Sequence, residues 1–435
     1  MRTAHRSGEM GKVFKGMATL ALGTGAARLI GIAAIPILTR LYTPADYGVL
    51  SVYVALVASI APVLTLRYVL AIPLPRSDAT AMNLMALSAA ICAVAASIVF
   101  TSLWAFGDTL LSWMSMEKLS VWWWLIALGG LFVALYEALT LWATRRRAYK
   151  DIAQTKVTQS VMGESVKIGL GLLAMKPVGL LLGHIVEQSG GITSLIVRFR
   201  TDLRRLAKRI SLGRMRVAAR TYRGFPAYRL PSQFLLVFST QAPAMFSAAL
   251  YGAAATGQLG LALMALAIPA NLIGQSVGQA FYGEIARFGK GSEQRIKQLS
   301  ISVQLRLFAL GLPVTLALVF LGRPVFGLMF GHEWKEAGLY ASILAPYVLL
   351  QLTSAPLMQV MNVYNAQGRF LLINILRTAG LLGVYFACKA LALDEVHFVS
   401  LLGGFLFAFY LLVTWFIIHL ISKRARLASL AADQA

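Results

Sequence analysis

The sequence predicts an all-α integral membrane protein, and three observations carry this prediction. Of the 435 residues, 58% are hydrophobic and only 13% are charged, and the mean hydropathy is +0.71. Soluble proteins average about 25% charged residues, so this chain could not cover a soluble surface. Apolar stretches long enough to cross a bilayer recur along the whole sequence. The excess of 40 Lys and Arg over 17 Asp and Glu falls on alternate connecting segments.

About twelve apolar stretches, bounded by charges or turn residues, are candidate membrane spans, since about 20 apolar residues suffice to cross the hydrocarbon core. Prolines and glycines occur inside several of them, which membrane helices tolerate because neighbouring groups satisfy the freed backbone. The stretches are 16–38, 47–66, 80–104, 119–143, 158–175, 178–197, 230–251, 258–283, 299–321, 338–361, 370–391 and 397–421.

The basic residues predict the orientation. One set of connections, together with both termini, carries nearly all Lys and Arg, whereas the opposite set holds six basic and seven acidic residues. Cytoplasmic loops of membrane proteins are enriched in Lys and Arg, so both termini are expected in the cytoplasm. The basic connections are 66–79, 144–157, 198–229, 284–298 and 362–369.

The most basic connection, 198–229, lies at the middle of the chain and separates six spans from six. Its arginines alternate with leucine and isoleucine, a pattern typical of a helix on an anionic membrane surface. Recognition of nucleic acid or phospholipid is the alternative interpretation. Since the net charge of +23 is explained by topology, nucleic acid is not expected as a partner.

A weak internal repeat supports two halves of the same topology. LYTPADYGVL at 41–50 and LYGAAATGQL at 250–259 share Leu-Tyr, a later Gly and a final Leu, each between the first and second span of its half. Such duplications occur in transporters. The expected domains are an N-terminal lobe at 1–200, a basic cytoplasmic elbow at 201–228 and a C-terminal lobe at 229–435.

Enzyme signatures are missing from the sequence. It contains no Walker A or HExxH motif, and its one GxSxG pattern, GQSVG at 274–278, lies inside an apolar stretch and not between a strand and a helix. Cys92 and Cys388 lie singly inside apolar runs. The longest expected outer loop, about 322–337, is too short for a catalytic domain. We therefore expect neither an enzyme nor a cofactor or metal site.

Ionisable residues inside the spans are the informative ones, because charges are costly in hydrocarbon and usually face a cavity or a partner. Arg28 lies near the centre of the first span, too deep to reach either surface easily. It is either a cavity-facing cation or the structural partner of a buried acid. Glu164 and Lys167 lie three residues apart in the fifth span and could simply neutralise each other. Glu187 in the sixth span could bind a proton or pair with Lys167 or Arg28.

Four further residues lie nearer the cytoplasmic side. Glu137, Arg306 and Arg377 each lie about seven or more residues inside a span, a distance over which arginine can partly reach the interface. Arg67 closes the second span, where an interfacial anchor is the simpler interpretation. Taken with Arg28 and Lys167, these arginines predict a cationic interior. Arginine binds phosphate oxygens bidentately, so the expected ligand is an anion with a phosphate or pyrophosphate head.

Three segments resemble a known family. PILTRLYTPADYGVL at 36–50, TLRYVLAIPLPRSDATAMNLMALS at 65–88 and FPAYRLPSQFLLVFSTQAPAMFSAALYG at 225–252 are similar to bacterial polysaccharide exporters, the Wzx-type oligosaccharide flippases. These belong to the multidrug/oligosaccharidyl-lipid/polysaccharide (MOP) superfamily. The resemblance implies two six-helix lobes that form a V around a central cavity. It also implies a role for Arg28, which matches basic residues of the family's first helix by position.

The resemblance further implies the function. The expected activity is movement of an undecaprenyl-diphosphate-linked sugar repeat from the cytoplasmic to the periplasmic leaflet of a bacterial inner membrane, for surface polysaccharide biosynthesis. Substrate binding is expected at Arg28, Lys167, Arg306, Arg377 and Arg67. Proton coupling is expected at Glu187, Glu164 and Glu137. Expected partners are the lipid-linked oligosaccharide, membrane lipids and a polysaccharide polymerase or chain-length machinery.

Three other classes stay open at this stage. A multidrug or small-cation antiporter related to the MATE exporters is the main alternative, although such a protein would favour an acidic cavity. A membrane polymerase or ligase would need a larger outer loop, and a scaffold for membrane enzymes is the third alternative.

Overall fold

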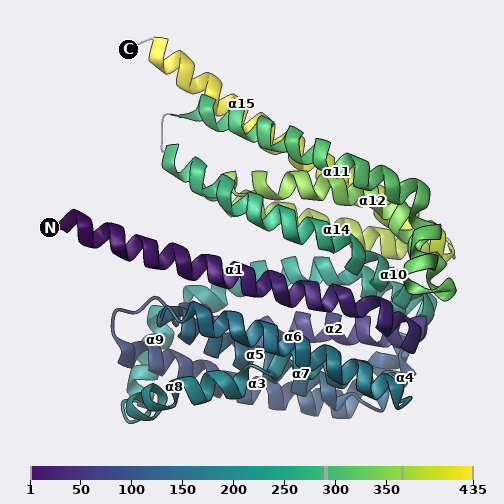
Figure 1. The fold of residues 1–435 in the computed structure, drawn as a ribbon, viewed down its shortest axis with the longest axis horizontal. Helices are drawn as coiled ribbons and strands as arrows, with labels where there is room; N and C mark the ends of the chain where they lie inside the picture. The colour runs from purple at the N-terminus through teal and green to yellow at the C-terminus, as the bar shows by residue number, and fades with distance from the viewer. Residues whose placement is uncertain (1, 289–291, 364–366, 434–435) are drawn as a thin grey trace. The chain divides into compact units, whose positions relative to one another are not determined.

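The computed structural model describes residues 2–288, 292–363 and 367–433, and all the regular structure in these ranges is helical (Figure 1). The chain divides into two compact units, Met1–Gln241 with Gly252–Ala254, and Ala242–Tyr251 with Ala255–Ala435. The prediction of an all-α membrane fold is confirmed. The expected lobe boundaries at 200 and 229 stay predictions.

In the first unit, α1 packs along α6, α6 packs against α7, and α2 and α3 both contact α5 (Figure 1). The core between α3, α5 and α8 is built around Trp142. The helices are α1 (Arg2–Leu41), α2 (Pro44–Leu64), α3 (Asp78–Trp113), α4 (Glu117–Ser120), α5 (Trp124–Arg145), α6 (Tyr149–Leu172), α7 (Val178–Ser189), α8 (Ile192–Ala207) and α9 (Leu212–Thr221), with the short turns η1 (Tyr68–Ala71) and η2 (Phe225–Arg229).

In the second unit, α11 packs against α12, and α15 contacts α11, α12 and α14. Its helices are the greater part of α10 (Leu230–Phe288), α11 (Glu293–Phe330), α12 (Lys335–Leu357), α13 (Val360–Val363), α14 (Gln367–Ala390) and α15 (Glu395–Asp433), with the turn η3 (His332–Trp334). The long helix α10 is interrupted at Gly252, whose φ of +77° lies in a region that glycine adopts at little cost.

The turn from α1 to α2 shows how the sequence fixes a helix start. The Thr43 hydroxyl accepts from the backbone N–H of Asp46, and the Asp46 carboxylate accepts from the backbone N–H of Thr43. This reciprocal capping box satisfies helix donors that otherwise lack partners. Pro44 occupies the first helical position, where its missing N–H costs nothing.

The two tyrosines of the internal repeat make comparable contacts. Tyr42 donates its hydroxyl proton to the carbonyl oxygen of Lys167 at 2.7 Å, within the first unit. Tyr251, its counterpart in the second unit, donates to the carbonyl oxygen of Leu393 at 2.9 Å. In each unit the repeated Leu-Tyr therefore ties the turn after a long helix to a later part of the same unit.

The basic elbow packs into the first unit. Asn83 on α3 is fully buried and donates from its side-chain amide to the carbonyl oxygen of Arg209 at 3.1 Å. Its carbonyl oxygen accepts from the backbone N–H of Ser211 at 3.0 Å. Phe199 of α8, just before the elbow, and Ala218 of α9 are buried in the same core as Trp142. One polar side chain thus fixes the link between α8 and α9.

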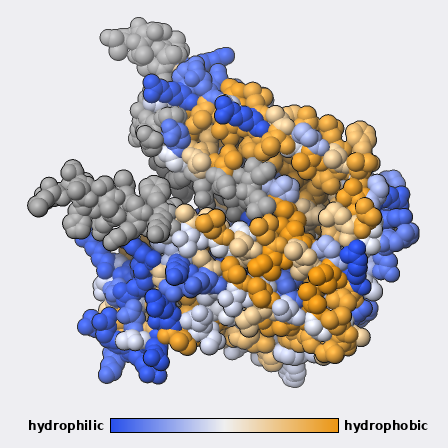
Figure 2. All heavy atoms as spheres, viewed as in Figure 1, coloured by the Kyte–Doolittle hydropathy of each residue, from blue (hydrophilic) through white to orange (hydrophobic). Residues whose placement is uncertain are grey.

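The apolar surface and the lengths of the helices both fit a membrane-spanning protein. Figure 2 shows predominantly apolar side chains along the helices, and Leu328, Phe320 and Trp104 are each at least 75% exposed. Ten helical segments in the described residues are long and apolar enough to span a bilayer. The stretch 158–175 lies in α6, which is too polar to qualify, and α10 contributes one segment where two were expected. The count of twelve and the cytoplasmic termini stay predictions.

Candidate functional site

An ion cluster lies between α6 and α7 of the first unit. The ammonium of Lys167 donates to Glu164 Oε1 at 2.9 Å and to Glu187 Oε2 at 2.8 Å. Both Lys167 and Glu164 are only 7% exposed. His184 Nδ1 lies 3.7 Å from Glu187 Oε2, so the imidazole borders the cluster. Of the pairings left open by the sequence, the structure shows that Glu187 contacts Lys167.

Two glycines allow α6 and α7 to approach closely enough for this cluster. A Cβ atom on Gly183 would overlap Lys167 Cγ and lie 2.9 Å from the carbonyl oxygen of Gly163. A Cβ atom on Gly163 would lie 2.6 Å from Glu187 Cβ. Any larger residue at either position would force the helices apart, so the glycines determine how tightly the ion cluster is enclosed.

The charges of this cluster do not balance. Two carboxyl groups face one ammonium, so the acids of this trio outnumber its base by one, and His184 and Arg28 are the other ionisable side chains nearby. Glu164 Oε2 is buried and has no hydrogen-bond partner among the described residues. Since an uncompensated buried charge is costly, a proton on one carboxylate would stabilise the cluster. The two carboxylates titrate as a coupled pair because they share Lys167.

Arg28 lies on α1 close to the ion cluster. It is half-buried, and the residue one helical turn later, Gly31, has its Cβ position 3.8 Å from Glu164 Oε1. The seam between α1 and α6 is closed by Ser160, whose hydroxyl donates to the carbonyl oxygen of Ala27 at 2.7 Å. Arg28 therefore lies on α1, the helix that packs over the ion cluster, next to the contact between Ala27 and Ser160.

Arg67 and Glu137 form a second buried pair in the first unit. Arg67 Nη1 donates to Glu137 Oε2 at 3.0 Å, and Arg67 is 5% exposed. The φ of Arg67 is +58°, an uncommon backbone conformation for a residue with a side chain, in the turn after α2. Burial lowers the pKa of its guanidinium, Glu137 opposes this shift and the positive charge of Arg229 adds to it. Arg67 is therefore a buried cation whose guanidinium contacts a carboxylate, and its predicted role in substrate binding stays a prediction.

The second unit carries a buried arginine without a carboxylate. Arg377 on α14 is 9% exposed, and its guanidinium carbon lies 5.7 Å from the ring centroid of Tyr410. The Tyr410 ring stacks on Tyr347, with centroids 6.4 Å apart. Arg377 Nε is buried without a hydrogen-bond partner, and no described carboxylate lies within ion-pair distance of this guanidinium. Arg306 on α11, in contrast, is exposed.

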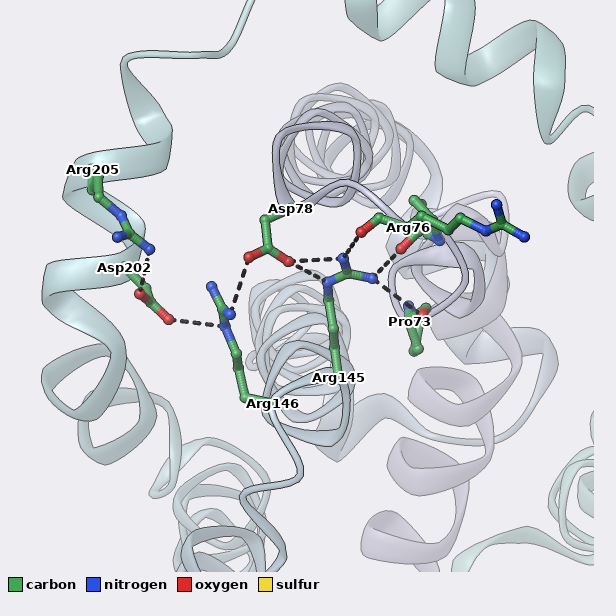
Figure 3. A network of polar contacts seen from close by, with 8 residues as sticks. Pro73, Arg76, Asp78, Arg145, Arg146, Asp202 and Arg205 are labelled. Atoms are coloured by element: carbon green, nitrogen blue, oxygen red, sulfur yellow. Dashed lines mark hydrogen bonds and ion pairs between the residues drawn. The ribbon is translucent and has the colours of Figure 1, made fainter. Parts of the chain in front are cut away.

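A third polar network was not predicted from the sequence. At the end of α5, Arg145 donates to Asp78 at the start of α3, and Arg146 pairs with both Asp78 and Asp202 of α8 (Figure 3). Arg145 also donates to carbonyl oxygens of the loop before α3, including that of Pro75 at 2.5 Å. The run of three arginines at 145–147 could have indicated this network, but we interpreted these residues only as part of a basic cytoplasmic connection.

The predicted site residues therefore fall into separate groups. Glu164, Lys167 and Glu187 lie together with Arg28 nearby, Glu137 is paired with Arg67, and Arg306 and Arg377 belong to the second unit. His184 and Tyr410 are the residues beside these groups that the sequence did not single out.

The sequence comparison decides the family. The family model for polysaccharide biosynthesis proteins matches residues 37–338, which is more than half of the chain. The chain belongs to this family. The resemblance of its three segments to polysaccharide exporters is thereby confirmed. No curated protein matches the chain.

Solved structures agree on the fold. The lipid II flippase MurJ, in an inward closed conformation, is similar with a TM-score of 0.69 at 10% identity, covering 94% of this chain and 91% of that one. An inward-facing MATE-family multidrug transporter of the MOP superfamily gives a TM-score of 0.63 at 12% identity, with 93% and 96% covered. A MOP-superfamily transporter from Pyrococcus furiosus gives 0.58 at 13% identity, with 95% and 96% covered. This family member is a multi-pass membrane protein with the MOP-superfamily fold.

Proposed function

We propose that this family member is a flippase for an isoprenoid-diphosphate-linked oligosaccharide, moving it between the leaflets of a bacterial inner membrane by alternating access. Membership of a polysaccharide biosynthesis family supports an oligosaccharide substrate. The fold shared with a lipid II flippase supports a lipid-linked one. The observation that carries the proposal is Arg377, a buried arginine with an unsatisfied Nε and no described carboxylate beside it.

The chemistry of Arg377 suits a diphosphate. A buried guanidinium needs an anionic counterpart, and its planar fork matches two phosphate oxygens. Tyr410 and Tyr347 hold the guanidinium from one side by cation–π contact and ring stacking. We assign recognition of the diphosphate to Arg377 in the second unit, and we keep Arg28 of the first unit as a proposed substrate-binding cation. Lys167 and Arg67 already hold carboxylates, and the exposed Arg306 could only act at a surface.

We assign coupling to the ion cluster of the first unit. Glu164 and Glu187 share the single ammonium of Lys167 in this buried cluster. One carboxyl group can therefore bind or release a proton without loss of a hydrogen bond to Lys167. A proton on Glu164 Oε2 would leave both bonds of Lys167 intact. Glu137 is less suited, because its single arginine partner balances its charge. Proton movement through the cluster would drive the conformational cycle.

The alternative function is a multidrug or small-molecule antiporter, which the MATE-like fold favours. An organic cation would be attracted by the excess negative charge between α6 and α7, but repelled by Arg377 in the second unit. Membrane lipids and a polysaccharide polymerase or chain-length machinery are the partners we expect for the flippase.

Export of surface polysaccharide tests the proposal. We expect that Arg377→Gln in a strain lacking the native copy abolishes surface polysaccharide and accumulates lipid-linked repeat units, at unchanged protein abundance. Lys389→Gln is the matched control, because Lys389 is an exposed cation on the same helix. Normal export by Arg377→Gln would remove Arg377 from the site. Drug resistance conferred by the chain, with no change in polysaccharide, would favour the antiporter.

A further inference from the structure

A basic pocket of about 490 Å³ opens at the turn between α5 and α6 of the first unit. Its walls are residues 146–151 with Gln154 of α6 and Arg198 and Phe199 of α8. We call it the turn pocket. It contains four cationic side chains and a single carboxylate, that of Asp151, so an anion entering it meets a positive field.

Arg146 forms the rigid wall of the turn pocket. Its Nη1 lies 3.1 Å from Asp78 Oδ2 and its Nε lies 2.9 Å from Asp202 Oδ2 (Figure 3). The guanidinium carbon lies 5.2 Å from the ring centroid of Trp142. Arg146 Nη2, however, is buried without a hydrogen-bond partner among the described residues, and Nε, although within ion-pair distance of Asp202, lacks one as well. The guanidinium of Arg146 is therefore held by ion pairs but is not fully satisfied by hydrogen bonds.

Two other cations of the turn pocket have no ion pair among the described residues. Arg147 and Lys150 are exposed, and neither has a carboxylate within ion-pair distance in the described ranges. Arg198 is paired with Asp151, whose carboxylate lies 3.3 Å from Arg198 Nε, so this pair closes the far side. Arg147 and Lys150 thus supply the charge that a bound anion would neutralise.

The start of α6 adds backbone donors. The residue before the helix is Ala148, whose methyl group cannot cap it, and the first N–H with a helical acceptor is that of Ile152. The preceding backbone N–H groups, at 149–151, lie at the positive end of a 24-residue helix. Phosphate oxygens are favoured at such an end.

An apolar groove joins the turn pocket. A cavity of about 750 Å³ between α1, α6 and the α7–α8 turn shares Lys150 and Gln154 with it. Leu22, Ala26 and Val157 line the groove together with several hydroxyl side chains. Leu22 is 76% exposed, so a hydrocarbon chain lying there would cover apolar surface.

We propose that the turn pocket binds the phosphate head of a membrane lipid, whose chain lies in the groove between α1 and α6. Arg147 and Lys150 would hold the phosphate, together with the N-terminus of α6, and the positive charge of Arg146 would add to the attraction. Both a glycerophospholipid and an isoprenoid diphosphate offer this chemistry. The site is separate from Arg377 and holds whether or not the chain flips an oligosaccharide.

Ligand titration of the full-length protein, delipidated in a neutral detergent, tests this site. The probes are dioctanoyl phosphatidylglycerol, farnesyl diphosphate and, as a zwitterionic reference, dioctanoyl phosphatidylcholine. We expect Arg147→Gln with Lys150→Gln to weaken binding of an anionic probe about 25-fold, since each cation contributes about fivefold. Tighter wild-type binding of phosphatidylglycerol or of farnesyl diphosphate identifies the source of the phosphate.

The control removes the same charge elsewhere. Arg200→Gln with Arg204→Gln deletes two exposed cations of α8 outside the turn pocket and should weaken binding less than about twofold, because salt screens them. Equal losses in both double variants, or no loss in the pocket variant, would overturn the site. As a second test, Thr158→Trp fills the groove and should weaken dioctanoyl phosphatidylglycerol but not inorganic pyrophosphate. Equal weakening of the binding of both probes would refute the placement of the lipid's hydrocarbon chain in the groove.

Discussion

Removal of Lys167 is the most informative perturbation of the ion cluster. Lys167→Met keeps the length of the side chain but deletes both ion pairs, with Glu164 at 2.9 Å and with Glu187 at 2.8 Å. Two carboxylates would then share a buried place without a cation. Loss of one partner from a buried ion pair costs about 3–5 kcal/mol, because the remaining charge stays buried.

This cost translates into a thermal shift. For a unit of this size, 1 kcal/mol changes the melting temperature by about 2–4 °C, so Lys167→Met should lower it by about 6–20 °C. The assay is tryptophan fluorescence of the detergent-solubilised protein during heating. Because the cost arises from stranded charge, replacing Glu164 and Glu187 by glutamine in the same chain should restore most of the loss.

A triple variant separates the effect of stranded charge from the effect of lost packing. If Lys167→Met melts like the wild type, the cluster is not a stabilising buried network. If the triple variant Lys167→Met, Glu164→Gln and Glu187→Gln melts as low as the single variant, the loss comes from packing of the lysine stem. Either result would contradict the charge argument made for this cluster.

Three further predictions concern contacts that position the helices. Gly183→Ala should destabilise the first unit by about 1–3 kcal/mol in the same melting assay, because its Cβ meets Lys167 and the Gly163 backbone; an unchanged melting temperature would contradict the close approach. Tyr251→Phe should cost about 1 kcal/mol through loss of its bond to Leu393, and a neutral result would show that this bond adds nothing. Asn83→Ala should release the α8–α9 link and speed trypsin cleavage within 204–216, whereas an unchanged cleavage rate would show that Asn83 does not hold it.

Hydropathy and charge were sufficient to predict the fold class. Each membrane helix must satisfy its backbone internally, so long apolar stretches have few alternatives to helix. The family resemblance rested on segments with specific local roles, such as Thr43 and Asp46, which form the capping box of α2. The number of spans stays a prediction, because α6 does not meet the criterion of length and hydropathy and α10 runs through a break at Gly252.

Site residues were predicted best where the partners are close in sequence. The bond between Glu164 and Lys167 follows from helical spacing, whereas the contact of Lys167 with Glu187 depends on glycines that bring two helices together. Arg145 and Asp78 are 67 residues apart, and nothing in the local pattern of either residue indicates the other. Long-range pairs of this kind require the tertiary structure.

Transbilayer movement of a defined lipid tests the central claim most directly. Purified protein in proteoliposomes, with an undecaprenyl-diphosphate-linked oligosaccharide in one leaflet, can be assayed by the access of an added glycosidase to the sugar. We predict that the protein moves the lipid to the other leaflet, that Arg377→Gln abolishes this movement and that Lys389→Gln retains it. Failure of the wild-type protein to move the lipid under a proton gradient, or equal movement by Arg377→Gln, would contradict the proposed flippase function.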